Sequence, residues 1–133
     1  MLASGVPAGT KFDGETVTFL NSQYHSRFYY LLDAGESNGD TINDAVYNRN
    51  VTVQEKLGVK FEFVEDDNTQ VLDKVRSAIM SDDDQWDIIL GMQYRMTTLT
   101  LGNLMYDLVD APYIGVNQPW WAGDYISNAQ CER

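Results

Sequence analysis

Amide and hydroxyl side chains follow two strongly apolar runs of this chain, one ending at Leu20 and the other at Leu90. The polar side chains in question are those of Asn21, Gln23, Gln93 and Tyr94. Neither group places a nucleophile beside a base, so these residue types favour hydrogen bonding to neutral hydroxyl groups. Turn formation at the surface is the alternative interpretation of the same residues.

The sequence has none of the common enzyme motifs. It lacks GxGxxG, a phosphate-binding GxxxxGK[ST] loop, a GxSxG elbow and CxxC. His25 has no second imidazole or triad partner nearby, and the acidic run 82–84 lacks the ligand spacing of a calcium loop. We therefore predict no catalytic residue, no metal site and no cofactor. A small flavodoxin-like or hydrolase-type α/β enzyme is the alternative function.

Length and charge describe a single acidic domain. The chain has 133 residues, of which 44% are apolar, and its net charge is −11. This charge disfavours nucleic acid and anionic membrane surfaces as partners. No run of about 18 apolar residues indicates a membrane span, and the single cysteine, Cys131, cannot form an internal disulfide. Residues 1–13 predict a flexible lead-in because small residues and proline dominate there.

Strand and helix patterns alternate along the chain. The predicted strands are residues 16–21, 59–65 and 86–92, and the predicted helices lie within residues 40–58 and 69–80. Alternating polar and apolar residues predict an edge position for 59–65, whereas the nearly continuous apolar run predicts a central, buried position for 86–92. The alternation predicts an α/β fold with a doubly wound, mostly parallel sheet. In such a sheet, ligands bind beyond the carboxyl ends of the strands.

Apolar stripes support the two helices. The first stripe consists of Val46, Val53 and Leu57, with Gly58 at the predicted helix end. The second stripe consists of Val71, Val75, Ala78 and Ile79. The long insert between Ser22 and Asn43 interrupts the short connections, and we expect a hairpin within residues 27–40.

Three segments carry a family resemblance. They read GDTINDAVYNRNVTVQEKLGVKFEF, WDIILG and GNLMYDLVDAPYIGVNQPWW. These segments, in this order and with the proline followed by paired tryptophans, make the chain resemble the amino-terminal lobe of extracellular solute-binding proteins of family 1. Members of that family serve ABC-type importers and often bind sugars or oligosaccharides.

The resemblance implies a periplasmic-binding-protein-like fold of type II, in which two α/β lobes close on a ligand. Residues 14–133 would then form part of the amino-terminal lobe, without the carboxyl lobe. The implied function is capture of a neutral solute, most often a carbohydrate, for delivery to ABC permease subunits. The implied location is extracellular, anchored at the cell envelope as a lipoprotein, with the signal and the anchoring cysteine absent from this sequence.

Trp120 and Trp121 complete the predicted ligand site. An indole face suits the apolar face of a pyranose ring, while amides bind its hydroxyls. Burial in a core or between lobes is the alternative interpretation of both tryptophans. We also expect a homo-oligomer through residues 112–130, since these aromatic side chains would lack neighbours in an isolated lobe. A module that binds a protein partner through an exposed apolar face is a third candidate function.

Overall fold

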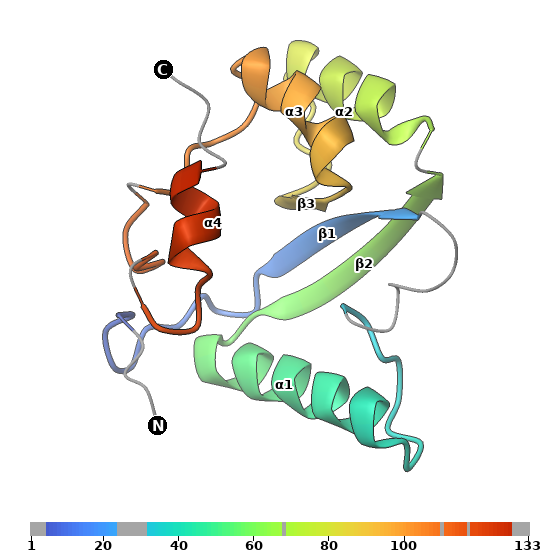
Figure 1. The fold of residues 1–133 in the computed structure, drawn as a ribbon. Helices are drawn as coiled ribbons and strands as arrows, with labels where there is room; N and C mark the ends of the chain where they lie inside the picture. The colour runs from blue at the N-terminus through green and yellow to red at the C-terminus, as the bar shows by residue number, and fades with distance from the viewer. Residues whose placement is uncertain (1–4, 24–31, 68, 110, 117, 129–133) are drawn as a thin grey trace.

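The computed structural model describes residues 5–23, 32–67, 69–109, 111–116 and 118–128. Its elements follow in the order β1 (Thr16–Gln23), α1 (Thr41–Leu57), β2 (Lys60–Asp67), α2 (Val71–Met80), β3 (Ile88–Leu90), α3 (Gln93–Leu101) and α4 (Gly123–Asn128). The strands of this part of the chain form one parallel sheet with the order β2-β1-β3 (Figure 1). The predicted α/β class and the parallel pairing are therefore confirmed.

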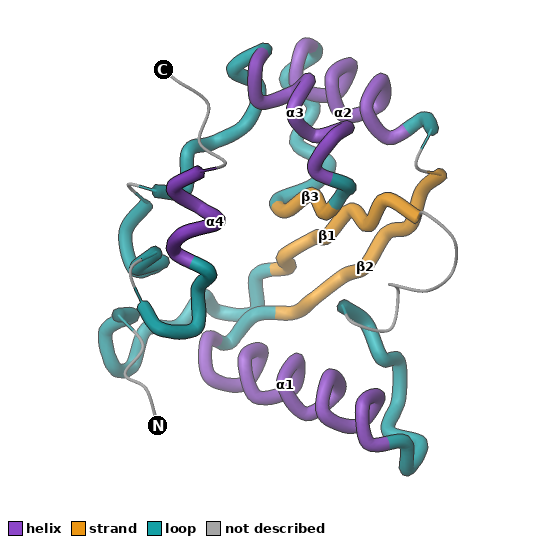
Figure 2. The backbone as a smooth tube through the Cα atoms, viewed as in Figure 1, coloured by secondary structure: helices purple, strands orange, loops and turns teal. Residues whose placement is uncertain are grey.

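Helices lie on both faces of the sheet. In Figure 2, α1 runs below the strands, while α2 and α3 lie above them. Side chains of successive strand residues point to opposite faces, so β1 supplies both layers. Phe19 packs against the rings of Phe61 and Phe63, with centroids 5.0 Å and 5.1 Å away. Its neighbour Leu20 is fully buried in the other layer, where the core cluster is Leu20, Val71, Val75 and Leu99.

Capping fixes both ends of α1. Asp40 accepts hydrogen bonds from the backbone N–H groups of Ile42 and Asn43 at 3.0 and 2.9 Å. Gly58 ends the helix in the left-handed region with φ 67°, as the sequence predicted. Val46 is buried on this helix, while Val53 and Leu57 are half-buried. The apolar stripe of the first helix thus faces the protein interior.

The stripe predicted for the second helix is right at three of its four positions. Val71, Val75 and Ala78 are buried in α2, but Ile79 is 39% exposed. Ile79 lies one position further round the helix than Ala78, so it flanks the buried face. Its side chain borders a surface pocket described below.

The central position predicted for the third strand is wrong. Only Ile88–Leu90 are in strand conformation, and β3 pairs with β1 alone among the described residues. Ile88 is 43% exposed. β1 is the middle strand instead, and β2 lies at the edge as predicted. A continuous apolar run reports how much surface a strand could bury, and it carries no information on how many neighbours the strand has.

The hairpin expected within residues 27–40 falls partly outside the described residues, and no strand is present in 32–40. Leu32 instead accepts a hydrogen bond of 2.8 Å from the buried amide of Asn50 on α1. In the predicted lead-in, the backbone N–H of Phe12 donates to Leu57 at 2.9 Å, and Lys11 Nζ donates to the backbone oxygen of Glu55.

Candidate functional site

Parallel pairing brings the predicted polar segments to the same end of the sheet. In the register, Asn21 of β1 lies opposite Leu90 of β3, and on its other side opposite Glu65 of β2. The segments that follow Leu20 and Leu90 therefore share the carboxyl edge of the sheet. Any role of these residues in binding stays a prediction.

Asn21 and Gln23 lie within β1, which runs two residues beyond the strand predicted for 16–21. The strand extends to Gln23 because β2 continues alongside it, with Gln23 paired to Asp67. Strand geometry then turns neighbouring side chains to opposite faces. Asn21 is half-buried and Ser22 is buried.

Gln93 and Tyr94 occupy the first turn of α3, a helix that the sequence patterns did not predict. Both side chains are exposed. The guanidinium of Arg95 lies over the ring of Tyr94, 5.5 Å from its centroid, and Arg95 Nε donates to the Tyr94 hydroxyl at 3.1 Å. The tyrosine ring is therefore held against a cation at the edge of the sheet.

The segment with the paired tryptophans is joined to this edge. The hydroxyl of Tyr125 on α4 hydrogen-bonds to the side-chain oxygen of Gln93 on α3. Trp121 Nε1 donates to the backbone oxygen of Ile114 at 3.3 Å, which fixes one indole within its own loop. Trp120 and Trp121 are 48% and 44% exposed, so both retain free ring surface. Burial in the core of this chain, the alternative for these tryptophans, is not what the structure shows.

The acidic side chains at the end of β2 already have partners. Asp66 accepts a hydrogen bond from Lys74 in an ion pair, and this contact lowers the pKa of the Asp66 carboxyl. Asp67 accepts from the hydroxyl and the backbone N–H of Thr69, and these bonds lower its pKa as well. These carboxylates are therefore ionised acceptors at the carboxyl edge.

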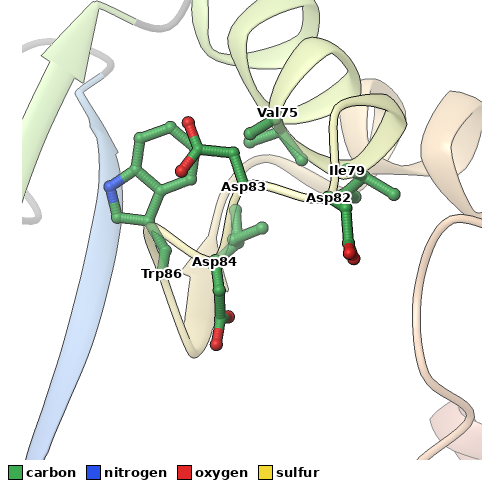
Figure 3. A pocket seen from close by; sticks show the side chains of 8 residues that line it. Val75, Ile79, Asp82, Asp83, Asp84 and Trp86 are labelled. Carbon is green, nitrogen blue, oxygen red and sulfur yellow. The ribbon is translucent and has the colours of Figure 1, made fainter.

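A surface pocket lies beside Trp86, at the acidic run 82–84. Figure 3 shows Val75 and Ile79 of α2 and the half-buried indole of Trp86 around it, with Asp82, Asp83 and Asp84 at its mouth. Its volume is about 300 Å³. The signal in the sequence was the tryptophan directly after the acidic run and before the apolar strand.

The electrostatics of this Trp86 pocket disfavour anions. The three carboxylates stand at the carboxyl end of α2, where the helix dipole is negative and the last turn has no basic residue.

A larger groove of about 640 Å³ along α2 shares Asp83 and Trp86 with the Trp86 pocket. The pocket lies apart from the predicted site residues, none of which lines it.

The described residues contain no group of three or more His, Cys, Asp or Glu side chains placed to hold a metal ion. Within the same ranges, no helix has the length and apolarity needed to cross a membrane. His25 and Cys131 lie outside the described residues.

Comparison with protein-family models, with curated proteins and with solved structures found no match to this chain.

Proposed function

We propose that this chain is a lobe of a solute-binding protein of an ABC-type importer, and that it binds a neutral carbohydrate. Two features support the proposal: the resemblance of three sequence segments to that family, and a parallel sheet with helices on both faces. A type II periplasmic-binding-protein-like lobe is the architecture we propose for it.

The hydrogen bond between Tyr125 and Gln93 carries the proposal. It ties the tryptophan segment to the first turn of α3, which follows the carboxyl end of β3. One residue of the predicted set, Gln93, is thereby linked to the helix that follows Trp120 and Trp121. Exposed indoles together with amides would recognise a sugar, because the rings stack on its C–H face and the amides bind its hydroxyls.

The surroundings favour a neutral ligand over a charged one. Net charge of −11 repels anions throughout the molecule. The acidic groups nearest the carboxyl edge, Asp66 and Asp67, already accept hydrogen bonds from Lys74 and Thr69. Arg95 lies against the Tyr94 ring. Neutral hydroxyl groups can bind the remaining amides without displacing an ion pair.

The proposed mechanism is capture between two lobes. A single lobe supplies half of the contacts, and closure by hinge motion would supply the rest. We expect the isolated chain to bind weakly, in the millimolar range that corresponds to about 4 kcal/mol. Delivery to permease subunits at the cell envelope is part of the same proposal.

The test is a titration of this chain with a broad saccharide panel. Binding is monitored through the indole N–H resonances in NMR spectra. We expect at least one saccharide to shift the resonances of Trp120 and Trp121 and to leave that of Trp86 unchanged. Asn21→Ala and Gln93→Ala should each weaken that binding, because each removes an amide from the proposed site. Asn48→Ala is the matched control, an exposed amide on α1 outside the predicted set.

A different ligand class would contradict the proposal. If amino acids or metal ions shift the resonances while no saccharide does, the carbohydrate assignment is wrong. If a saccharide shifts only Trp86, the ligand binds at the Trp86 pocket and the proposed site is wrong.

A further inference from the structure

The apolar wall of the Trp86 pocket is part of the core of the fold. Val75 belongs to the buried core cluster, and Trp86 and Ile89 pack against that cluster. Ala78 and Ile79 of α2 complete the apolar lining. Because the wall is held by core packing, a ligand would lose little binding free energy to rearrangement of the protein.

The mouth of the pocket carries negative charge that no basic side chain balances. Within the described ranges, the one ion pair joins Lys74 to Asp66, so the carboxylates of residues 82–84 have no cationic partner there. Asp83 accepts a hydrogen bond from the side-chain amide of Gln85, and a carboxylate can accept several more. The negative end of the α2 dipole adds to the same field. The mouth therefore favours a cation.

One carboxylate and one indole meet where the pocket joins the larger groove along α2. Asp83 and Trp86 line both hollows. In Figure 3 the Asp83 carboxylate lies on the side of the indole, whereas the carboxylates of Asp82 and Asp84 point away from it. A positively charged nitrogen at this junction would face a carboxylate and an aromatic ring together, and both stabilise a cation.

The two sides of the junction differ in polarity. The pocket side is lined by the apolar side chains named above, whereas the groove side is mainly polar, with Asp73, Ser77, Ser81 and Gln85. A calcium ion would need about six to eight oxygen ligands, and the described residues do not gather even three acidic side chains into a metal-binding group. The site therefore suits a cation that carries an apolar body.

We propose that the Trp86 pocket binds a small organic ammonium ion with an apolar body. The ammonium group donates to Asp83 and lies against the indole of Trp86, while the body contacts Ile79 and Ile89. A volume of about 300 Å³ is at the small end of ligand sites, so we expect a ligand of the size of phenethylamine. This inference does not rest on carbohydrate binding, because none of the predicted site residues lines the pocket.

The experiment is a titration of the whole chain with phenethylammonium chloride, monitored through the indole N–H resonances. We expect the Trp86 resonance to shift and those of Trp120 and Trp121 to stay unchanged. Phenethyl alcohol has the same body without the charge and should bind about tenfold more weakly, and phenylacetate should not bind. Sodium chloride should weaken the binding of the amine severalfold, because the Debye length falls from about 10 Å at 0.1 M to about 3 Å at 1 M.

A charge-removing variant tests the role of the carboxylate. Asp83→Asn should weaken binding of the amine about tenfold and leave binding of the alcohol unchanged, since only the amine uses the charge. Misfolding would weaken both ligands together. Glu55→Gln is the matched control: it removes the same charge from an exposed position on α1, on the other face of the sheet, and should leave binding of the amine unchanged.

Three results would overturn the proposal. The first is a Trp86 resonance that the amine does not shift, and the second is equal affinity for the amine and the alcohol. The third is a shift of Trp86 by calcium chloride that the amine does not produce, because the carboxylates would then hold a metal ion. The saccharide test is read at Trp120 and Trp121, so these results leave the proposed function untouched.

Discussion

The hydroxyl of Tyr125 donates to the side-chain oxygen of Gln93, across 32 positions of the sequence. Gln93 begins α3 just after the carboxyl end of β3, and Tyr125 lies in the short helix α4. No buried residue anchors α4, so this polar contact has unusual weight in positioning it. The paired tryptophans lie just before α4, so their position depends on the position of that helix.

Removing that hydroxyl should loosen α4. We expect Tyr125→Phe to raise the hydrogen-exchange rates of residues 123–128 several-fold, because a hydrogen bond of this kind contributes about 1 kcal/mol. Tyr113→Phe is the control and should leave these rates unchanged. Equal rates in the Tyr125→Phe variant and the unmodified protein would show that other contacts hold α4.

The centre of the core should respond strongly to truncation. Leu20 is fully buried in the middle strand and packs with Val71, Val75 and Leu99. Leu20→Ala should lower the free energy of unfolding by about 2 to 5 kcal/mol, through lost burial and the cavity left behind. Ile88→Ala in the edge strand should cost less, because Ile88 is 43% exposed. Urea denaturation compares the two, and a larger loss at Ile88 would contradict the strand order.

The carboxylate of Asp87 fixes the start of β3 to β1. Its Oδ2 accepts from the backbone N–H of Thr18 at 2.7 Å, and its own N–H donates to the Thr18 carbonyl at 3.0 Å. Asp87→Ala should reduce stability by about 1.5 to 3 kcal/mol, the usual value for a hydrogen bond to a charged group, or less at this exposed site. Asp84→Ala, in the preceding loop, serves as the control. Similar unfolding midpoints for both variants would refute this role of Asp87.

Acid should weaken the loop that precedes α1. Asp44 accepts hydrogen bonds from the backbone N–H of Asn38 and the hydroxyl of Ser37, both 2.9 Å, and these bonds lower its pKa. A carboxyl whose pKa is lowered on folding stabilises the protein above its unfolded pKa of about 3.9. That contribution is lost as the pH falls through the lower pKa of the folded state.

The measurement is thermal unfolding as a function of pH between about 2 and 6. Asp44→Asn should lower the melting temperature at pH 6 and make the acid dependence shallower than in the unmodified protein. Ser37→Ala removes one of the donors and should give an intermediate slope. An unchanged slope in Asp44→Asn would mean that the Asp44 contacts do not differ between the folded and unfolded states.

Local patterns in the sequence determined those elements whose ends and buried faces depend only on residues close together in the chain. The limits of α1 follow from Asp40 and Gly58, because a capping side chain and a left-handed glycine act on the nearest backbone groups. The buried face of α2 follows from helical spacing of Val71, Val75 and Ala78. Alternation of strand and helix was enough to predict the parallel sheet, and with it the shared edge of Asn21 and Gln93.

Tertiary structure alone decided the order of the strands and the contacts between distant residues. β1 is central because β2 and β3 both pair with it, and the apolar content of a strand does not encode its neighbours. α3 was missed because threonines dilute its apolar pattern and only Leu99 is buried. The link from Tyr125 to Gln93 joins polar side chains of two separate helices. Such a contact depends on how the whole chain packs, so no local pattern could predict it.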